Sequence, residues 1–442
     1  MKIAVIGAGY VGLVTAAGFA EFGNDVTIID AVESKITALE RGQIPFYEPG
    51  LEDIVKRNAG AKRIGYKIGI DKATLDESEV IFLCVGTPQS DDGSADLTAL
   101  WDVVKLHLGL YKPEKTKLLV LKSTVPVGTG YAVREHLQRV SDNWKVANNP
   151  EFLREGTAVE DFLRPDRVVV GVADQWSEQT LRRLYEPVAN CGPLMVMDSS
   201  SAELTKYAAN SMLAMRISFM NEIARVSESV GADAEMVRKG AGADKRIGPS
   251  YLYPGPGFGG SCFTKDLSAL VHTAGEHGQE MLLAKATLEV NRLQKHIPVE
   301  KLKRMLGGSL VGKTVGVWGL AFKPYTDDIR DSPAIVVVQD LLAEGAKVQV
   351  HDPKATENFF RLFPGSQEGR LSWCNDPYSA AAGAAGVILV TEWREYRTPD
   401  FMHLKRMAPN VAVVDARNVW REEDARAAGV RYARIGRASR DL

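Results

Sequence analysis

The stretch KIAVIGAGYVGLVTAAGFAEFGNDVTIID, residues 2–30, decides the fold of the N-terminal part of the chain. Its first residues form a short β-branched apolar run, which is typical of a strand buried on both faces of a parallel sheet. Gly7, Gly9 and Gly12 follow in GxGxxG spacing and lead into a helical pattern, after which DVTIID predicts a second strand. This strand–helix–strand context makes the glycine motif far more specific than the motif alone.

The same stretch indicates a dinucleotide site. Glycines at this spacing let a pyrophosphate lie at a helix N-terminus, and Asp30, at the end of the second strand, would bind the adenosine ribose. Because Asp30 would repel a 2′-phosphate and no arginine follows in AVESK (31–35), the pattern favours NAD over NADP. The alternative is a glycine-rich turn without a ligand. Lys35 is either a cofactor contact or a solvated surface lysine.

Composition sets the broad class of protein. With 442 residues, 45% apolar and 25% charged, the chain predicts a soluble globular protein of two or three domains. A net charge of −2 argues against nucleic acid or an anionic membrane as partner. No apolar run approaches the roughly 18 residues of a membrane span, and the N-terminus lacks a signal-peptide layout. Four scattered cysteines, at 84, 191, 262 and 374, favour a reducing cytoplasm, and we assign no metal site.

Three further segments predict strand ends at one edge of the first sheet. Residues 80–88 and 117–129 are apolar runs entering loops, so Thr87 and Thr124 are candidate cofactor contacts, with turn-capping as the alternative. WKVANNPEFLREG then brings residues 151–155, two carboxylates beside an arginine, to the same edge. These could serve anion binding and acid–base chemistry, or form a surface ion pair. Cys84, inside its apolar strand, is expected to be a core residue.

Residues 199–231 predict one long helix of about 30 residues. Ser200 and Glu203 stand in capping-box spacing at its start, and Gly231 marks its end. The helix is apolar almost all round, which predicts burial between domains or at a subunit contact. Lys206 and Asn210 lie on one face at i, i+4. A lysine in such surroundings needs an anionic partner, which favours a site role, although Glu203 could also be that partner.

GPGFGGSCFTKD, residues 255–266, surrounds Cys262 with glycines. Glycine is used where φ is positive or where backbones approach closely, so this stretch is either a tight loop with a buried cysteine or a nucleophile held against a substrate. SCFTKDLSAL predicts a helix that Cys262 opens, three residues before Lys265. Both the helix N-terminus and the lysine would lower the pKa of the thiol.

The C-terminal part predicts a second, smaller parallel sheet. A strand within 312–324, a helix and a strand ending on Asp352 mimic the first unit, but GLAFKP lacks the GxGxxG spacing, which favours a nucleotide other than a second NAD. Strands at 386–392 and 411–417 follow. We therefore predict an α/β protein of two Rossmann-like doubly wound domains joined by a long central helix and a helical middle domain. The expected boundaries are 1–198, 199–300 and 301–442.

The ordered strings GAGYVGL, IPFYEPGL, VGTP, STVPVGT, NPEFLREG, NEIA, RIGP, PGFGGSCF and GLAFKP resemble the UDP-glucose/GDP-mannose dehydrogenase family over nearly the whole chain. One departure is Thr264, where the family usually has proline. Since proline would restrict one φ angle, we expect a looser backbone beside the thiol but no loss of a reactive group.

The resemblance implies four-electron oxidation of UDP-glucose to UDP-glucuronate by two NAD. Cys262 would hold the aldehyde as a thiohemiacetal and then form a thioester, and Glu151 would activate water. The other implied catalytic residues, which orient water, stabilise the oxyanion or complete the set, are Lys206, Asn210, Asp266 and Thr124. The implied NAD contacts are Gly7, Gly9, Tyr10, Val11, Gly12, Asp30, Lys35, Thr87, Thr124, Glu155, Lys265 and Arg330.

The implied nucleotide-sugar contacts are Glu151, Phe152, Leu153, Arg154, Lys206, Asn210, Arg246, Tyr251, Leu252, Tyr253, Pro254, Gly255, Gly259 and Lys323. Arg246 resembles the arginine that homodimers of this family lend to the partner's substrate. Two alternatives stay open: a GDP-mannose 6-dehydrogenase or another nucleotide-sugar 6-dehydrogenase of the same mechanism, and a non-catalytic nucleotide-sugar-binding protein. Retention of Cys262, Lys265 and Asp266 argues against the second, because binding alone needs no thiol.

Overall fold

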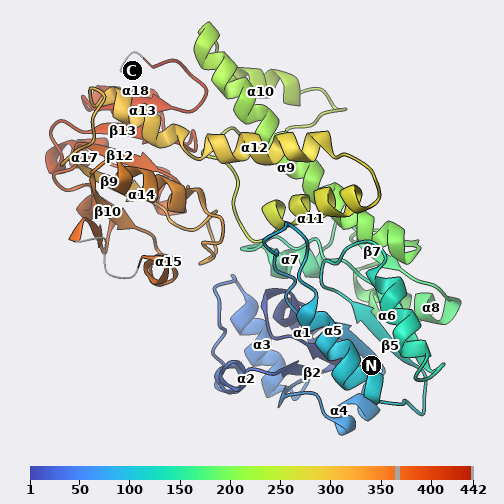
Figure 1. Ribbon diagram of the computed structural model, residues 1–442. Coiled ribbons are helices and arrows are strands. Elements are labelled where there is room, and N and C mark those ends of the chain that lie inside the picture. The colour runs from blue at the N-terminus through green and yellow to red at the C-terminus, as the bar shows by residue number, and fades with distance from the viewer. Residues whose placement is uncertain (364–368, 440–442) are drawn as a thin grey trace. The chain divides into compact units, whose positions relative to one another are not determined.

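The computed structural model describes residues 1–363 and 369–439. The chain divides into two compact units, one of residues 1–209 with 268–280 and one of residues 210–267 with 281–442. A parallel β-sheet flanked by helices forms the centre of each unit (Figure 1). The prediction of two doubly wound α/β sheets with a helical middle segment is confirmed.

The first sheet has the strand order β3-β2-β1-β4-β5-β6-β7-β8. Its strands are β1 (Lys2–Ile6), β2 (Asp25–Asp30), β3 (Ile64–Ile68), β4 (Val80–Leu83), β5 (Lys117–Leu121), β6 (Trp144–Asn148), β7 (Val168–Gly171) and β8 (Leu194–Met197). Neighbouring strands pair in parallel except β6 with β7. The order reverses between β1 and β4, and a crevice at such a switch point is where doubly wound sheets bind ligands.

Helices cover the first sheet. They are α1 (Tyr10–Glu21), α2 (Glu33–Glu40), α3 (Leu51–Gly60), α4 (Lys72–Glu77), α5 (Thr98–Asp102), α6 (Thr129–Gln138), α7 (Ala158–Leu163) and α8 (Gln175–Leu184). A π-helical turn, Val103–His107, and short 3₁₀ turns complete the connections. Strands β4 and β5 are buried along their whole length, which explains why their sequences are continuous apolar runs.

The long helix is α9 (Ser199–Val230), as predicted, and Gly231 follows it with φ of +77°. The predicted capping box is wrong. Asp198 caps this end, accepting hydrogen bonds from the Ser201 N–H at 2.9 Å and the Ser201 hydroxyl at 2.6 Å. Glu203 instead accepts bonds from a distant loop. The other helices of this region are α10 (Ala234–Gly242), α11 (Phe263–Glu276) and α12 (Leu282–Gln294).

The second sheet has the order β11-β10-β9-β12-β13-β14, all parallel. Its strands are β9 (Thr314–Trp318), β10 (Lys347–His351), β11 (Leu371–Trp373), β12 (Gly386–Leu389), β13 (Ala412–Asp415) and β14 (Arg431–Arg434). Its helices are α13 (Ile297–Met305), α14 (Pro333–Ala343), α15 (Thr356–Leu362), α16 (Pro377–Ala381), α17 (Phe401–Met407) and α18 (Glu422–Ala427).

Asp352 after β10 occupies the place that Asp30 has after β2. Its carboxylate accepts hydrogen bonds from the backbone N–H groups of Leu320 and Ala321, from two more N–H groups after the strand, and from the Trp393 indole. These donors hold the turn after β9. Asp352 therefore stabilises this turn, and the choice of a nucleotide other than a second NAD for this sheet stays a prediction.

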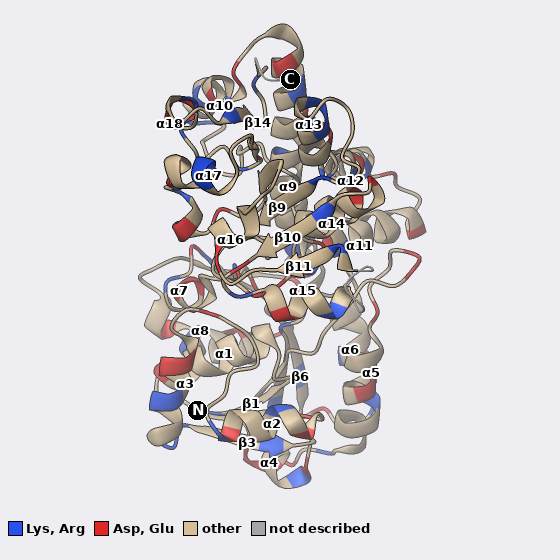
Figure 2. Cartoon of the chain, turned by 90° about the vertical axis from the view of Figure 1, so that its left-hand side faces the viewer, with Lys and Arg blue, Asp and Glu red and all other residues tan. Residues whose placement is uncertain are grey.

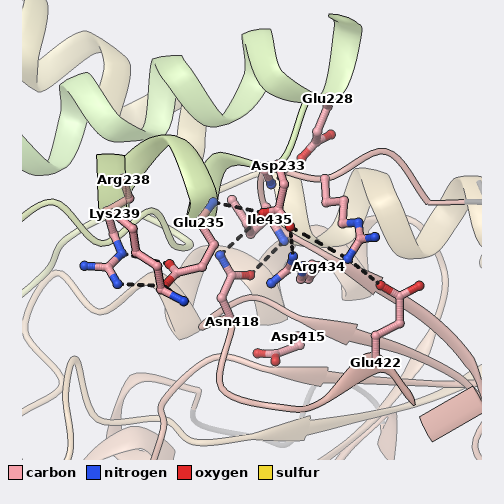
Figure 3. Close-up of polar contacts among 12 residues, drawn as sticks. Glu228, Asp233, Glu235, Arg238, Lys239, Asp415, Asn418, Glu422, Arg434 and Ile435 are labelled. Carbon is pink, nitrogen blue, oxygen red and sulfur yellow. Dashed lines mark hydrogen bonds and ion pairs between the residues drawn. The ribbon is translucent and has the colours of Figure 1, made fainter. Parts of the chain in front are cut away.

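Polar contacts fasten the end of the chain to the helical region within the second unit (Figure 3). Asp233 caps α10 through the Glu235 N–H and also pairs with Arg434 at 2.6 Å. Glu228 of α9 accepts hydrogen bonds from the Gly436 N–H at 2.7 Å and from the buried Lys301 ammonium at 2.6 Å. These ion pairs connect the second sheet with α9 and α10.

Lysines and arginines are interspersed with acidic residues along the elements of both sheets (Figure 2). No helix within residues 1–363 and 369–439 is long and apolar enough to cross a membrane.

Candidate active site

Packing within the protein requires glycine at two of the three motif positions, Gly7 and Gly12, whereas the space around Gly9 is open. Gly7 has φ of +104°, and a Cβ there would lie 2.7 Å from the Cys84 carbonyl oxygen. A Cβ on Gly12 would lie 1.8 Å from the Gly7 carbonyl oxygen. A Cβ on Gly9 would meet no other part of the described chain within 4 Å. Gly9 directly precedes α1 and protein packing does not explain this glycine, so close approach of a pyrophosphate stays the prediction for it.

Asp30 lies beside the glycine loop. Its carboxylate accepts hydrogen bonds from the Ala8 N–H at 2.8 Å and the Val32 N–H at 2.9 Å, and the Lys35 ammonium is 3.6 Å away. Each carboxylate oxygen has two lone pairs, so capacity for ribose hydroxyls remains. The predicted cofactor residues Gly9, Asp30 and Lys35 thus come together at one edge of the sheet.

Thr87 and Thr124 follow the neighbouring strands β4 and β5, and both are buried. The Thr87 hydroxyl donates to the Thr124 carbonyl at 2.9 Å. The structure therefore brings these two residues together, and their contact with the cofactor stays a prediction. Cys84 is a core residue, as expected, and burial raises the pKa of its thiol to about 12.

Glu48, within IPFYEPGL, ties the glycine helix to the loop that follows Glu155. Its buried carboxylate accepts hydrogen bonds from the Tyr10 hydroxyl, the Gly156 N–H at 2.6 Å and the Ala158 N–H at 2.8 Å. Burial raises the pKa of Glu48. Tyr10 is therefore held by protein, and Glu48 sets the position of the predicted contact Glu155.

Glu151 and Lys206 form a buried ion pair. Lys206 Nζ lies 2.9 Å from Glu151 Oε1, and the two side chains are 4% and 7% exposed. The other carboxylate oxygen of Glu151 accepts the Leu153 N–H at 2.6 Å. Burial by itself would raise the pKa of Glu151, but the ammonium and this N–H more than offset it, so its pKa lies below the usual value.

Glu203 is not the partner of Lys206. Its carboxylate accepts hydrogen bonds from the N–H groups of Gly128 and Gly130, each at 2.7 Å, and from the Asn148 amide at 2.9 Å. Burial raises the pKa of Glu203. The alternative pairing that the sequence left open is therefore wrong.

Lys122 is a buried residue that the sequence analysis missed. Its ammonium donates to the Asn149 side-chain oxygen at 2.9 Å, an atom that also accepts the Tyr185 hydroxyl. Burial lowers the pKa of Lys122 to about 8, and its charge in turn helps to lower the pKa of Glu151. A lysine within an otherwise apolar strand end, LLVLKS, was the signal available in the sequence.

Phe152 and Arg154 continue from Glu151. The Arg167 guanidinium lies 3.8 Å from the Phe152 ring centroid, and the Lys206 ammonium lies 5.3 Å from it. Arg154 is exposed and pairs with Asp161 at 2.5 Å. The surface partner of Arg154 thus lies outside the run 151–155, and its contact with the nucleotide sugar stays a prediction.

A second group of candidates gathers around Cys262. The thiol residue directly precedes α11, whose first turn is closed by the Asp266 N–H donating to the Cys262 carbonyl at 2.9 Å. The Asp266 side chain is 1% exposed and accepts hydrogen bonds from the Asn210 amide at 2.6 Å and the Lys265 ammonium at 2.5 Å. The structure therefore places the half-buried Cys262 at the start of the helical turn that carries this charged, hydrogen-bonded cluster.

Side chains of Arg216, Asn221 and Gln294 form hydrogen bonds with the backbone of the glycine loop and of the turn before it. Tyr251 has φ of +61°, and the Arg216 guanidinium holds three carbonyls of the turn at 247–250. Gly255 donates to the Asn221 side chain at 2.8 Å and accepts from Gln294 at 2.8 Å. Leu252 and Pro254 are buried. Tyr253 is exposed, and the Arg238 guanidinium lies over its ring.

The remaining predicted basic residues are close to the surface. The Arg246 side chain is 89% exposed and pairs with Asp244, and the exposed Arg330 pairs with Asp328. Lys323 is partly buried and lies 5.2 Å from the Phe322 ring centroid. Arg417 was missed: it follows β13, donates to the carbonyl of Phe322 at 3.2 Å and lies next to Gly255. Within the described part of the chain, no group of His, Cys, Asp and Glu side chains could hold a metal ion.

A sheet switch point with a dinucleotide loop, together with a second parallel sheet and a loop-borne thiol, defines a nucleotide-dependent dehydrogenase of two Rossmann-like domains. The chain belongs to the UDP-glucose/GDP-mannose dehydrogenase family. Its NAD binding domain model matches residues 1–189, its central domain model residues 200–293 and its UDP binding domain model residues 316–422. NAD is the cofactor of this family's first domain.

Full-length relatives support this assignment. The chain is 44% identical to a UDP-glucose 6-dehydrogenase of Rhizobium meliloti over 99% of this chain and all of that one. It is 42% identical to a UDP-glucose 6-dehydrogenase of Pseudomonas aeruginosa, over 99% of this chain and 98% of that one. A solved UDP-glucose dehydrogenase from Pyrobaculum islandicum superposes with a TM-score of 0.90 at 37% identity, covering 99% and 98% of the two chains.

Proposed function

We propose that the protein oxidises UDP-glucose to UDP-glucuronate, using two NAD and a thioester on Cys262. The observation that carries this proposal is the Cys262 turn itself, in which the Asp266 N–H donates to the Cys262 carbonyl and the Asp266 carboxylate accepts hydrogen bonds from Asn210 and Lys265. The similarity to full-length UDP-glucose 6-dehydrogenases and the match to a UDP binding domain support the choice of substrate.

NAD, held at the glycine loop of the first sheet, would supply the hydride acceptor for two successive oxidations. The first converts the primary alcohol to an aldehyde, and the Cys262 sulfur then adds to the carbonyl carbon to give a thiohemiacetal. Loss of a second hydride from that carbon leaves a thioester. Each oxidation also releases one proton from the hydroxyl on the reacting carbon. Water then adds to the thioester and the carbon–sulfur bond breaks, which gives the carboxylate, a proton and the free thiol.

Glu151 is the proposed base for the water. Its carboxylate is ionised because Lys206 lies 2.9 Å away, and an ionised carboxylate can accept a proton. Asn210 and Asp266, which hold each other at 2.6 Å, are the groups proposed to orient the water and to stabilise the oxyanion. Thr124, which follows β5, is included among the proposed catalytic residues because of the resemblance to the family.

Asp30, Lys35, Thr87 and the motif glycines are proposed to hold NAD, with Tyr10, Val11, Glu155, Lys265 and Arg330. The nucleotide sugar would contact residues 151–154, Lys206, Asn210, residues 251–255, Gly259 and Lys323. We also propose that residues 1–198, 199–300 and 301–442 act as the NAD-binding, helical and UDP-sugar-binding domains. The three family-model ranges support these boundaries.

We propose a homodimer formed along α9. Met212, Phe219 and Val226 are exposed at seven-residue intervals, and Val230 extends the row by one turn. Heptad spacing of apolar side chains is the pattern of a helix that packs on a second helix. The exposed Arg246 would then reach the partner's substrate. Phe219→Glu should convert a dimer to monomers in analytical ultracentrifugation, whereas an unchanged mass would contradict this contact. We also propose a reducing, cytoplasmic location, since none of the four cysteines, all of which lie among the described residues, forms a disulfide bond.

The assay that tests the function measures NADH and sugar product together. We expect two NADH per UDP-glucuronate and no free aldehyde. A ratio of one with aldehyde accumulating would contradict the four-electron route. Faster turnover of GDP-mannose or a UDP-N-acetylhexosamine would keep the mechanism but change the substrate, and binding without any NADH formation would identify a non-catalytic binding protein.

A further inference from the structure

The loop that carries Cys262 lies directly on the segment 328–332 of the same unit. The Gly260 N–H donates to the Arg330 carbonyl at 2.8 Å. A Cβ on Gly259 would lie 2.4 Å from the Asp331 carbonyl oxygen, and one on Gly260 would lie 2.8 Å from the Phe322 ring. A side chain at Gly259 would therefore meet backbone, and one at Gly260, whose φ is +90°, would meet the Phe322 ring, so packing within the protein explains both glycines.

A side-chain link joins the same two segments. Thr264, two residues beyond Cys262 in the first turn of α11, donates its hydroxyl hydrogen to the Asp331 carboxylate. The other carboxylate oxygen accepts the Lys295 ammonium at 2.5 Å, and Lys295, whose side chain is 8% exposed, also donates to the Asp331 carbonyl at 3.0 Å. Asp331 thus connects the start of α11 with the end of α12.

Asp331 has a backbone conformation that suits this role. Its φ is +53°, in the left-handed region that residues other than glycine seldom adopt, although aspartate tolerates it better than most. Such a conformation persists only where its surroundings hold it, and here the carboxylate and the carbonyl both face Lys295.

We propose that Thr264 and Asp331 are positioning residues for the Cys262 thiol. The inference rests on the proposed function, in which Cys262 is the nucleophile. The thiol is attached where the glycine loop meets α11, and glycines on its N-terminal side give that junction little rigidity of their own. The Thr264–Asp331 hydrogen bond fixes the C-terminal side, which is where proline would otherwise restrict the backbone. It thereby keeps the sulfur at the N-terminus of α11 and at a constant position relative to the substrate.

Thr264→Val tests this proposal, since valine keeps the shape and removes the hydroxyl. Thr264→Ser restores the hydroxyl, and Thr273→Val makes the same change nine residues further along α11. All variants are compared in a Cys191→Ser background, because Cys191 is an exposed thiol that would consume the alkylating reagent. The measurements are kcat, both KM values, melting temperature and the rate of Cys262 alkylation by iodoacetamide, with the labelled peptide identified by mass spectrometry.

For Thr264→Val we expect kcat to fall roughly tenfold or more, because small displacements of a reacting group cost up to about a hundredfold. Both KM values should stay within about twofold, since the hydroxyl lies outside the proposed binding contacts. Cys262 alkylation should slow several-fold, because a thiol displaced from the helix N-terminus loses stabilisation of its thiolate. Thr264→Ser should restore both rates, and Thr273→Val should match the parent.

Thr264→Val with the parent's kcat and alkylation rate would overturn the proposal, as would equal losses in Thr264→Ser. A loss of melting temperature alone, with both rates unchanged, would show a purely structural link. If Thr264→Val does not fold, Asp331→Asn replaces it, because asparagine keeps an acceptor for Lys295. This variant must then show a lower kcat with unchanged KM values, or the proposal is wrong. The alkylation result is independent of turnover, so a wrong assignment of the reaction would appear separately, in the NADH stoichiometry.

Discussion

Lys206 Nζ lies 2.9 Å from Glu151 Oε1, and both side chains are buried. The ammonium offsets the desolvation of the carboxylate, so Glu151 remains ionised in surroundings that would otherwise favour its protonated form. The pair joins α9 to the end of β6 and keeps an ionised carboxylate in buried surroundings.

Glu151→Gln should stop thioester hydrolysis while leaving the two oxidations possible. We expect a burst of about two NADH per active site followed by turnover at least about a hundredfold slower than wild type, the kinetic signature of an accumulating acyl-enzyme. Rapid-quench measurement and intact-protein mass spectrometry would detect the adduct on Cys262. Glu160→Gln, an exposed change on α7, is the control and should behave as wild type. Steady turnover without an adduct in Glu151→Gln would exclude Glu151 as the base.

Cys262→Ser should bind NAD and the nucleotide sugar but lose turnover, because the hydroxyl is a far poorer nucleophile at neutral pH. The matched controls are Cys84→Ser, Cys191→Ser and Cys374→Ser, which should stay active when folded. Among them Cys84→Ser should lose the most stability, since its side chain is buried against the motif glycines. UDP-glucose should protect Cys262 from iodoacetamide. Near-normal turnover of Cys262→Ser would show that this cysteine is only a structural part of a glycine loop.

Asp30 should set the preference for NAD over NADP. Asp30→Ala should lower kcat/KM for NAD by roughly tenfold to a hundredfold, the scale of one or two lost hydrogen bonds to a charged acceptor, and should change kcat/KM for NADP much less. Asp352→Asn is the counterpart in the second sheet: it should lower the melting temperature and leave the NAD/NADP ratio unchanged, because its oxygens accept protein donors. Equal use of both cofactors by the wild type would contradict the role given to Asp30.

Lys122 should make stability rise with pH above neutrality. Its pKa is about 8 in the folded protein and near 10.5 when unfolded. Between these two pKa values the unfolded chain binds more protons than the folded protein does. The contribution of Lys122 to the free energy of unfolding therefore increases as pH rises through this window, and it is lowest below pH 8. The full change is on the order of 3 kcal/mol.

Lys122→Met keeps the volume and removes the buried charge, so it should be more stable than wild type near pH 7 and the difference should shrink toward pH 10. Urea unfolding at several pH values measures both curves. Lys56→Met, which changes an exposed lysine paired with Glu52, should show no such convergence. A pH-independent difference between Lys122→Met and wild type would mean that Lys122 is not charged and buried as described.

The sequence alone determined the elements whose signals are local. Apolar runs, motif glycines and the acid at residue 30 predicted the first strand–helix–strand unit, and the periodicity of residues 199–231 predicted α9. Both sheets follow from such runs, because parallel strands buried on both faces must be apolar throughout. The start of α11 just after Cys262 was also predictable, because the beginning of a helix depends on hydrogen bonds between residues close together in the chain.

The tertiary structure decided which polar groups meet. Lys206 could reach Glu203 by spacing along α9, yet its partner is Glu151, 55 residues away in the chain. Thr264 meets Asp331 across 67 residues, and Glu48 meets the loop at Gly156 across 108. Periodicity reports which face of an element is apolar, but the choice of partner for a charge depends on how distant segments approach one another. That approach is set by the packing of the whole core, which no local pattern contains.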